Sequence, residues 1–150
     1  MERIQNIKDT EQNIEYIAEV LGIDKDYITY DEEEQVYLIS TLQELEIKKE
    51  VDFSQLRNFP LKFTKCHFSQ GLLVYEQEFK EKLIFDNVVF SKSINFSRNT
   101  FSREVGFFGC EFENKLYQII KAILSFLILL GLRSLNVSYT THTIKKTRKV

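Results

Sequence analysis

Bulky apolar residues recur at regular intervals through the middle of the chain. Reading backward from Phe112, they fall at positions 107, 101, 96, 90, 85, 79, 74, 68 and 63, in steps that alternate between five and six residues. All of them are phenylalanine except Val74, so the repeat has a period of eleven residues. A second apolar column precedes the first by two residues and consists of Leu61, Leu72, Leu83, Ile94 and Val105. This self-similarity indicates a repeat architecture.

A period of eleven residues is compatible with two kinds of structure. A helix with about 3.67 residues per turn would form a right-handed coiled coil. However, steps of five and six residues rotate a helical position by about 140° and 240°, which scatters the phenylalanines around the helix. In an extended strand, residues two apart point to the same side, and this suits the apolar-x-Phe spacing. The pattern therefore predicts a β-solenoid whose short strands turn a corner every five or six residues.

Five-residue units can be aligned along this region. Val51-Asp52-Phe53-Ser54-Gln55 and Ile94-Asn95-Phe96-Ser97-Arg98 each have a branched apolar residue first, Asp or Asn second, Phe in the centre and Ser fourth. The units centred on Phe68, Phe90 and Phe101 share part of this pattern. Thirteen units run from Leu45 to Asn114, with single residues inserted at Glu50, Gly71, Lys82, Ser93 and Glu104. The stretch resembles the pentapeptide-repeat proteins. The resemblance implies a mainly β fold, a right-handed quadrilateral β-helix of about three coils.

In that family the central residue of each unit and the residue two before it point inward. The resemblance thus implies a structural core of Phe53, Phe63, Phe68, Phe79, Phe85, Phe90, Phe96, Phe101, Phe107 and Phe112. Some positions depart from the family pattern. Val74 and Asn58 occupy unit centres, and Leu73 and Ile84 stand at second positions where the family prefers Asp or Asn.

Residues 1–44 are predicted to cover one open end of the solenoid. Asp9 and Thr10 can cap a helix whose apolar positions recur at three- and four-residue spacing until Gly22, which predicts a helix over about 10–22. Short strands are expected over 27–30 and 36–40, around the acidic run 31–34. That run is read as a solvated hairpin tip in preference to a binding site for a basic partner.

Residues 115–150 form a third region, in which an apolar segment over about 116–132 precedes a basic tail. As a helix, this segment would span about 25 Å, slightly less than a bilayer core, and Lys121 interrupts it. Three interpretations stay open: a helical cap on the solenoid, a membrane anchor, and out-of-frame sequence. The last is considered because the phenylalanine register, the acidic residues and the repeat all stop near Asn114.

Charge divides the chain at the same boundaries. The net charge is −2, but residues 1–114 carry −9 and residues 115–150 carry +7. Within 45–114, ten acidic and ten basic residues cancel. One proline, five glycines and two cysteines exclude collagenous, linker-like and disulfide-rich classes. No secretory signal is recognised at the amino terminus, so we expect a cytoplasmic protein, with membrane attachment through 116–132 as the alternative.

Residues suited to catalysis or metal binding are sparse. Cys66 and Cys110 fall at the same inward position two coils apart, roughly 10 Å from each other, which is too far for a disulfide and indicates small core residues. His67 has no acidic partner in its own unit, and His142 lies in the basic tail. We find no phosphate-binding loop and no metal-ligand cluster, and we expect neither an enzyme nor a cofactor.

The expected function is that of a non-enzymatic, rigid protein-binding or scaffold module with a protein as its partner. Its outer faces would carry residues such as Lys65, Gln70, Lys80, Glu81, Asn87 and Lys92. Some pentapeptide-repeat proteins resemble duplex DNA and bind type II topoisomerases, which gives one alternative. The neutral charge of 45–114 does not favour such mimicry, and direct nucleic-acid binding is not expected. A membrane-anchored solenoid is another alternative.

Overall fold

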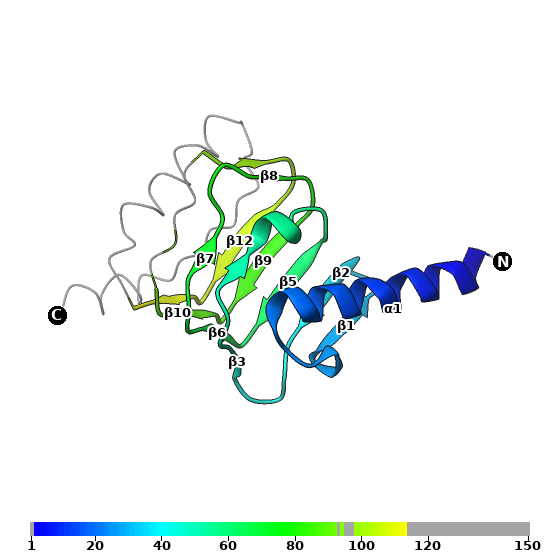
Figure 1. Ribbon diagram of the computed structural model, residues 1–150, viewed down its shortest axis with the longest axis horizontal. Helices are drawn as coiled ribbons and strands as arrows, with labels where there is room; N and C mark the ends of the chain where they lie inside the picture. The colour runs from blue at the N-terminus through cyan, green and yellow to red at the C-terminus, as the bar shows by residue number, and fades with distance from the viewer. Residues whose placement is uncertain (1, 93, 95–97, 114–150) are drawn as a thin grey trace.

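Short β-strands stacked in about three coils make up most of the structure, with one helix near the amino terminus (Figure 1). The computed structural model describes residues 2–92, 94 and 98–113, with side chains from Asp9 onward. The predicted β-solenoid is confirmed. The apolar helix expected over about 116–132 lies outside the described residues.

Over the described residues, the coils are built from eleven strands and one short helical turn. Successive strands β5, β6, β7 and β8 belong to four different sheets, and β9 returns to the sheet of β5. Apart from the first two strands, all neighbours in these sheets are parallel. The elements are β3 (Leu45–Ile47), β4 (Val51–Asp52), η2 (Phe53–Gln55), β5 (Leu61–Thr64), β6 (Cys66–Phe68), β7 (Leu72–Leu73), β8 (Glu78–Phe79), β9 (Leu83–Asp86), β10 (Val89–Phe90), β11 (Thr100–Phe101), β12 (Val105–Phe108) and β13 (Glu111–Phe112).

Phenylalanines from successive coils stack in columns inside the solenoid. Phe63, Phe85 and Phe107 occupy paired positions in β5, β9 and β12, and these positions lie 22 residues apart, which is two periods of eleven. Phe85 and Phe107 stack with their ring centroids 5.1 Å apart. Nine of the ten predicted core phenylalanines are buried. Phe96 lies outside the described residues.

The inserted residues join one coil to the next. The carbonyl groups of Gly71, Lys82 and Glu104 accept hydrogen bonds from the first residues of strands in the preceding coil, at 3.1, 2.9 and 3.0 Å. The donors are the backbone amides of Val51, Leu61 and Leu83. An extra residue at these corners therefore lengthens the turn and also satisfies a backbone donor of the neighbouring coil.

One corner of the solenoid repeats a left-handed backbone conformation in three coils. Lys65, Asn87 and Gly109 have φ angles of 53°, 52° and 57° and follow β5, β9 and β12. This conformation is costly for residues with a Cβ atom. At Gly109 an added Cβ would also lie 2.7 Å from the Asn87 side-chain oxygen, so glycine fits this position best.

The helix α1 (Glu2–Leu21) is longer than predicted, because it begins at Glu2 and not near residue 10. Residues 2–8 contain no proline or glycine to end it, and the capping preference of Asp9 and Thr10, worth about 1 kcal/mol, does not determine where the helix starts. Gly22, with φ 65°, follows its last turn. The fully buried side chains of Ile17 and Leu21 join the core and attach the helix to the solenoid.

A hairpin extends the largest sheet beyond the first coil. After η1 (Lys25–Tyr27), β1 (Ile28–Asp31) pairs antiparallel with β2 (Val36–Ile39), and β2 pairs parallel with β5. The Asp31 carboxylate accepts hydrogen bonds from the backbone amides of Glu33 and Glu34, and the side chains of 32–34 are exposed. Lys62 contacts the Glu34 carboxylate at 2.8 Å, so one member of the acidic run anchors the tip to the solenoid.

A search for membrane-spanning helices covered the part of the chain that the structure describes. None of the helices there is long and apolar enough to cross a bilayer.

Candidate protein-binding face

Two large apolar side chains project from the solenoid where β7 ends. Leu72 and Val74 are buried, whereas Leu73 at the end of β7 and Tyr75 in the turn that follows are 50% and 43% exposed. In the described part of the solenoid these are the exposed large hydrophobic residues. Exposed leucine and tyrosine side chains this close in the sequence offer apolar area that a protein partner can bury.

Arg98 from the next coil borders this apolar pair. Its guanidinium carbon lies 5.8 Å from the centre of the Tyr75 ring, and its Nη1 contacts the Glu76 carboxylate at 2.9 Å. The hydrogen bond from Arg98 lowers the pKa of Glu76, and the same bond raises the pKa of Arg98. Both residues adopt left-handed φ angles, 54° for Glu76 and 58° for Arg98, at equivalent corners of successive coils. The backbone thus holds the pair beside the tyrosine.

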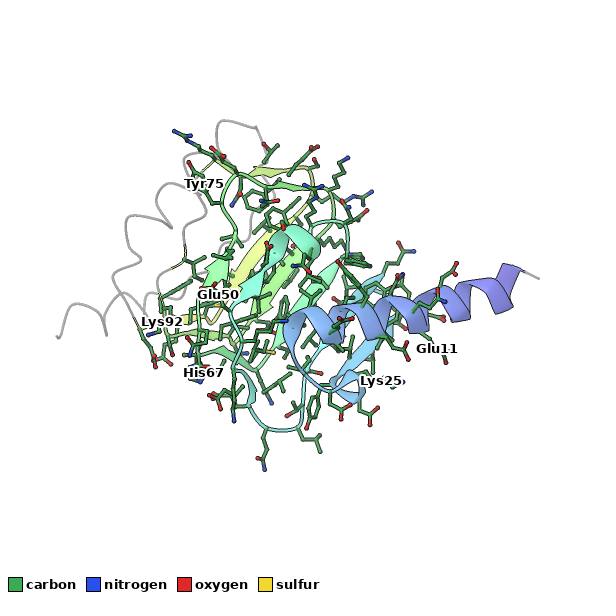
Figure 2. The ribbon with its side chains drawn as sticks, viewed as in Figure 1. Glu11, Lys25, Glu50, His67, Tyr75 and Lys92 are labelled. Carbon is green, nitrogen blue, oxygen red and sulfur yellow. The ribbon has the colours of Figure 1, made fainter. Side chains whose placement is uncertain are left out.

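We define the apolar face as Leu73, Tyr75, Glu76 and Arg98. Tyrosine and arginine are enriched at the energetic centres of protein interfaces, where aromatic area combines with directed hydrogen bonds. Figure 2 shows Tyr75 at the upper left, far from Lys25 and Glu11 on the side of α1. The apolar face therefore lies on the solenoid and away from α1.

The surface residues predicted from the sequence do not form one site. Lys65 and Asn87 lie at the corner between the first two sheets of each coil, and Gln70 and Lys92 follow β6 and β10 at the next corner. Lys80 and Glu81 lie between β8 and β9, where Glu81 contacts Arg103 at 3.7 Å. The structure places these six residues at three separate corners.

His67 has partners that the sequence did not suggest. Its Nε2 lies 2.6 Å from the Ser91 hydroxyl, and its Nδ1 lies 3.4 Å from a Glu44 carboxylate oxygen. The partners belong to the coils above and below, so an acid is present although the unit of His67 contains none. The expectation that the unit of His67 contains no acidic partner holds, and the acid comes from outside that unit. His142 lies outside the described residues.

The order serine, histidine and acid is also that of hydrolase triads. Acyl transfer further needs hydrogen-bond donors aimed at the developing oxyanion. The Ser91 backbone amide already donates to the Phe68 carbonyl at 3.1 Å, and Glu44 is largely exposed. We interpret the contacts of Ser91, His67 and Glu44 as a polar network that links neighbouring coils on their outer surface.

The two cysteines are buried, and within the described residues neither forms a disulfide. The strand register places Val88 between them in one inward column, since Val89 pairs with His67 on one side and Glu111 on the other. Burial raises the pKa of each thiol to about 12. The Cys110 Sγ lies 3.3 Å from the Phe85 carbonyl oxygen, as expected for a thiol that donates within the core. Within the described residues, no group of three or more metal-ligating side chains comes together.

Comparisons of the chain with family models, with curated proteins and with solved structures found no match. The candidate face therefore depends on the geometry of the described residues. One signal for it is visible in the sequence, because Leu73 departs from the Asp or Asn expected at its position. No sequence signal marks Tyr75, because its exposure depends on the direction that the chain takes after β7.

Proposed function

We propose that the chain is a pentapeptide-repeat protein with a right-handed, four-sided solenoid. Four sheets visited in turn by successive strands support the four-sided shape. The thirteen units, and the phenylalanine columns that repeat every 22 residues, support membership of that family.

We further propose that the protein is a rigid protein-binding module and not an enzyme. The observation that carries this proposal is the exposure of Leu73 and Tyr75 beside Arg98. Stacked rings inside the coils and hydrogen bonds between strands fix the backbone that carries these side chains, so little backbone entropy is lost when a partner binds. Repeat arrays commonly present such preformed surfaces to other proteins.

Site-directed photo-crosslinking tests the proposal in cells that produce the full chain. A photoreactive phenylalanine analogue is placed at position 73 or 75, and at position 100 as a control. Thr100 is exposed on the neighbouring side of the solenoid, in β11. Discrete crosslinked products are expected from positions 73 and 75 and not from 100. The Arg98→Glu change should remove them, because it repels Glu76 and releases the tyrosine.

The captured protein must then bind the purified full chain. Tyr75→Ala should weaken that binding by at least about tenfold, as expected for an interface tyrosine. Thr100→Ala should leave the affinity unchanged. Equal crosslinking from all three positions, or affinity that does not depend on Tyr75, would contradict the proposal.

A further inference from the structure

A groove lies between α1, η1 and β1, on the side of the molecule where Figure 2 shows Glu11 and Lys25. Its volume is about 460 Å³. Ile14 and the buried Ile28 give it an apolar floor, and charged side chains of α1 and η1 form its rim. A groove of this composition can take an apolar side chain and hold charged groups on either side of it.

The rim of the groove is negative. The Lys25 ammonium contacts the Glu15 carboxylate at 3.0 Å, so these two charges compensate each other. Glu11 and Asp26 stay exposed, and among the side chains that the structure describes neither has an ion-pair partner within 4 Å. Glu15, Asp26 and Glu11 together outnumber Lys25, the one cation among the described residues of the rim, whose pKa the hydrogen bond to Glu15 and the charges of the three acids raise. Twelve acidic and three basic residues give residues 1–44 a net charge of −9. The local field therefore favours a cationic ligand.

The groove is lined in part by Ile28 and Thr29 of the edge strand β1, and Tyr30 follows them just outside the lining. Among the strands that the structure describes, β1 is the terminal strand of the five-stranded sheet and pairs with β2 alone. The Tyr27 carbonyl accepts a hydrogen bond from the Ser40 amide. Along an antiparallel pair, residues that bond to the partner strand alternate with residues whose N–H and C=O groups point away from it. Tyr30 is three residues after Tyr27, so its backbone groups point away from β2. Outward N–H and C=O groups of an edge strand can pair with one more extended segment.

We propose that this groove binds an extended segment of a partner protein in which Lys or Arg residues flank an apolar or β-branched residue. The apolar side chain contacts Ile14 and Ile28, the flanking cations lie beside Glu11 and Asp26, and the backbone of the segment pairs with Tyr30. The site is separate from the apolar face of Leu73 and Tyr75. It therefore stands or fails independently of the function proposed above.

The test uses the full chain and a displayed library of random twelve-residue peptides. Selected peptides are expected to share a basic and β-branched pattern, and the strongest one is synthesised as the probe. Its affinity should fall by about tenfold for the variant Glu11→Gln/Asp26→Asn. The variant Glu32→Gln/Glu33→Gln removes the same charge from the exposed hairpin tip and should leave the affinity unchanged. The bound probe should also slow hydrogen exchange of the Tyr30 amide.

Several outcomes would overturn the proposal. One is equal weakening by both double variants, which would show a response to total charge and not to the groove. Another is a probe that binds without protecting the Tyr30 amide, and a third is the absence of any selected peptide. Finally, the full chain alone could self-associate in sedimentation experiments, with the association lost in Glu11→Gln/Asp26→Asn. In that case the occupant is a second copy of this chain and not a partner protein.

Discussion

Replacing Phe90 with alanine would remove the middle ring of one phenylalanine column. Phe90 is 1% exposed. It stacks on Phe68 at 5.5 Å and on Phe112 at 5.0 Å, with interplanar angles of 6° and 12°, and meets Phe85 edge-on at 5.3 Å. The backbones of these neighbours are fixed by strand pairing on both sides of β10. The surrounding core therefore has little freedom to fill the space that the ring leaves.

The expected loss follows from this rigidity. Truncation of a buried phenylalanine to alanine costs about 3–5 kcal/mol, and the cost rises when the cavity does not collapse. We expect the free energy of unfolding to fall by about 4 kcal/mol. Domains of this kind are stable by only about 5–15 kcal/mol, so the variant should lose a large part of its stability.

Urea unfolding of the full chain, followed by far-ultraviolet circular dichroism, measures this loss. Leu73→Ala is the control, because Leu73 is half exposed and its truncation should cost less than about 1 kcal/mol. Phe90→Leu retains most of the volume and should cost under about 2 kcal/mol, which provides a reading if the alanine variant does not fold. A cost for Phe90→Ala no greater than that of Leu73→Ala would refute the stacked-column account.

Three further predictions concern the thiols, a capping carboxylate and a corner glycine. Burial raises the pKa values of Cys66 and Cys110 to about 12. Neither thiol should therefore react with Ellman's reagent at pH 8 until urea unfolds the chain. Fast reaction in the native state would contradict their burial. The hydrogen bonds from the Ser54 side chain and backbone lower the pKa of Asp52. The contribution of Asp52 to stability is therefore complete at pH 7 and is lost as the pH falls below about 4. Asp52→Ala should cost about 1 kcal/mol at pH 7, and in urea titrations the difference from the wild type should shrink in acid. Gly109→Ala should lower the stability measured by thermal unfolding by about 1–2 kcal/mol, whereas Lys65→Gly at the same corner should be neutral or stabilising. Equal effects of the two changes on stability would contradict the left-handed conformation of this corner.

The solenoid could be predicted because its signal repeats. Each phenylalanine alone is compatible with a helix or a strand, but a regular step of five and six residues suits only a chain that turns at regular corners. The inserted residues at Gly71, Lys82 and Glu104 were visible as breaks in the five-residue pattern. Their role as acceptors of hydrogen bonds between coils became clear only from the structure.

Features that depend on packing between distant residues could not be predicted. His67 meets Ser91 and Glu44 because adjacent coils align residues 24 and 23 positions away, and this alignment depends on how each corner turns. The groove depends on the angle at which α1 lies against the hairpin. The helix α1 starts at Glu2 and not near residue 10, because residues 2–8 contain no helix breaker and the capping preference of Asp9 and Thr10 is too weak to end it there.

The stacking of coils can be observed directly through scalar couplings across hydrogen bonds, in an isotope-labelled sample of the full chain. The structure predicts couplings from the Leu61 amide nitrogen to the Lys82 carbonyl carbon, and from the Leu83 nitrogen to the Glu104 carbon, across bonds of 2.9 and 3.0 Å. Both couplings join residues 21 apart in sequence. Their detection would establish the register on which the core, the corners and the apolar face depend. Couplings from the same amides to carbonyl carbons four residues earlier would indicate a helix and contradict the solenoid.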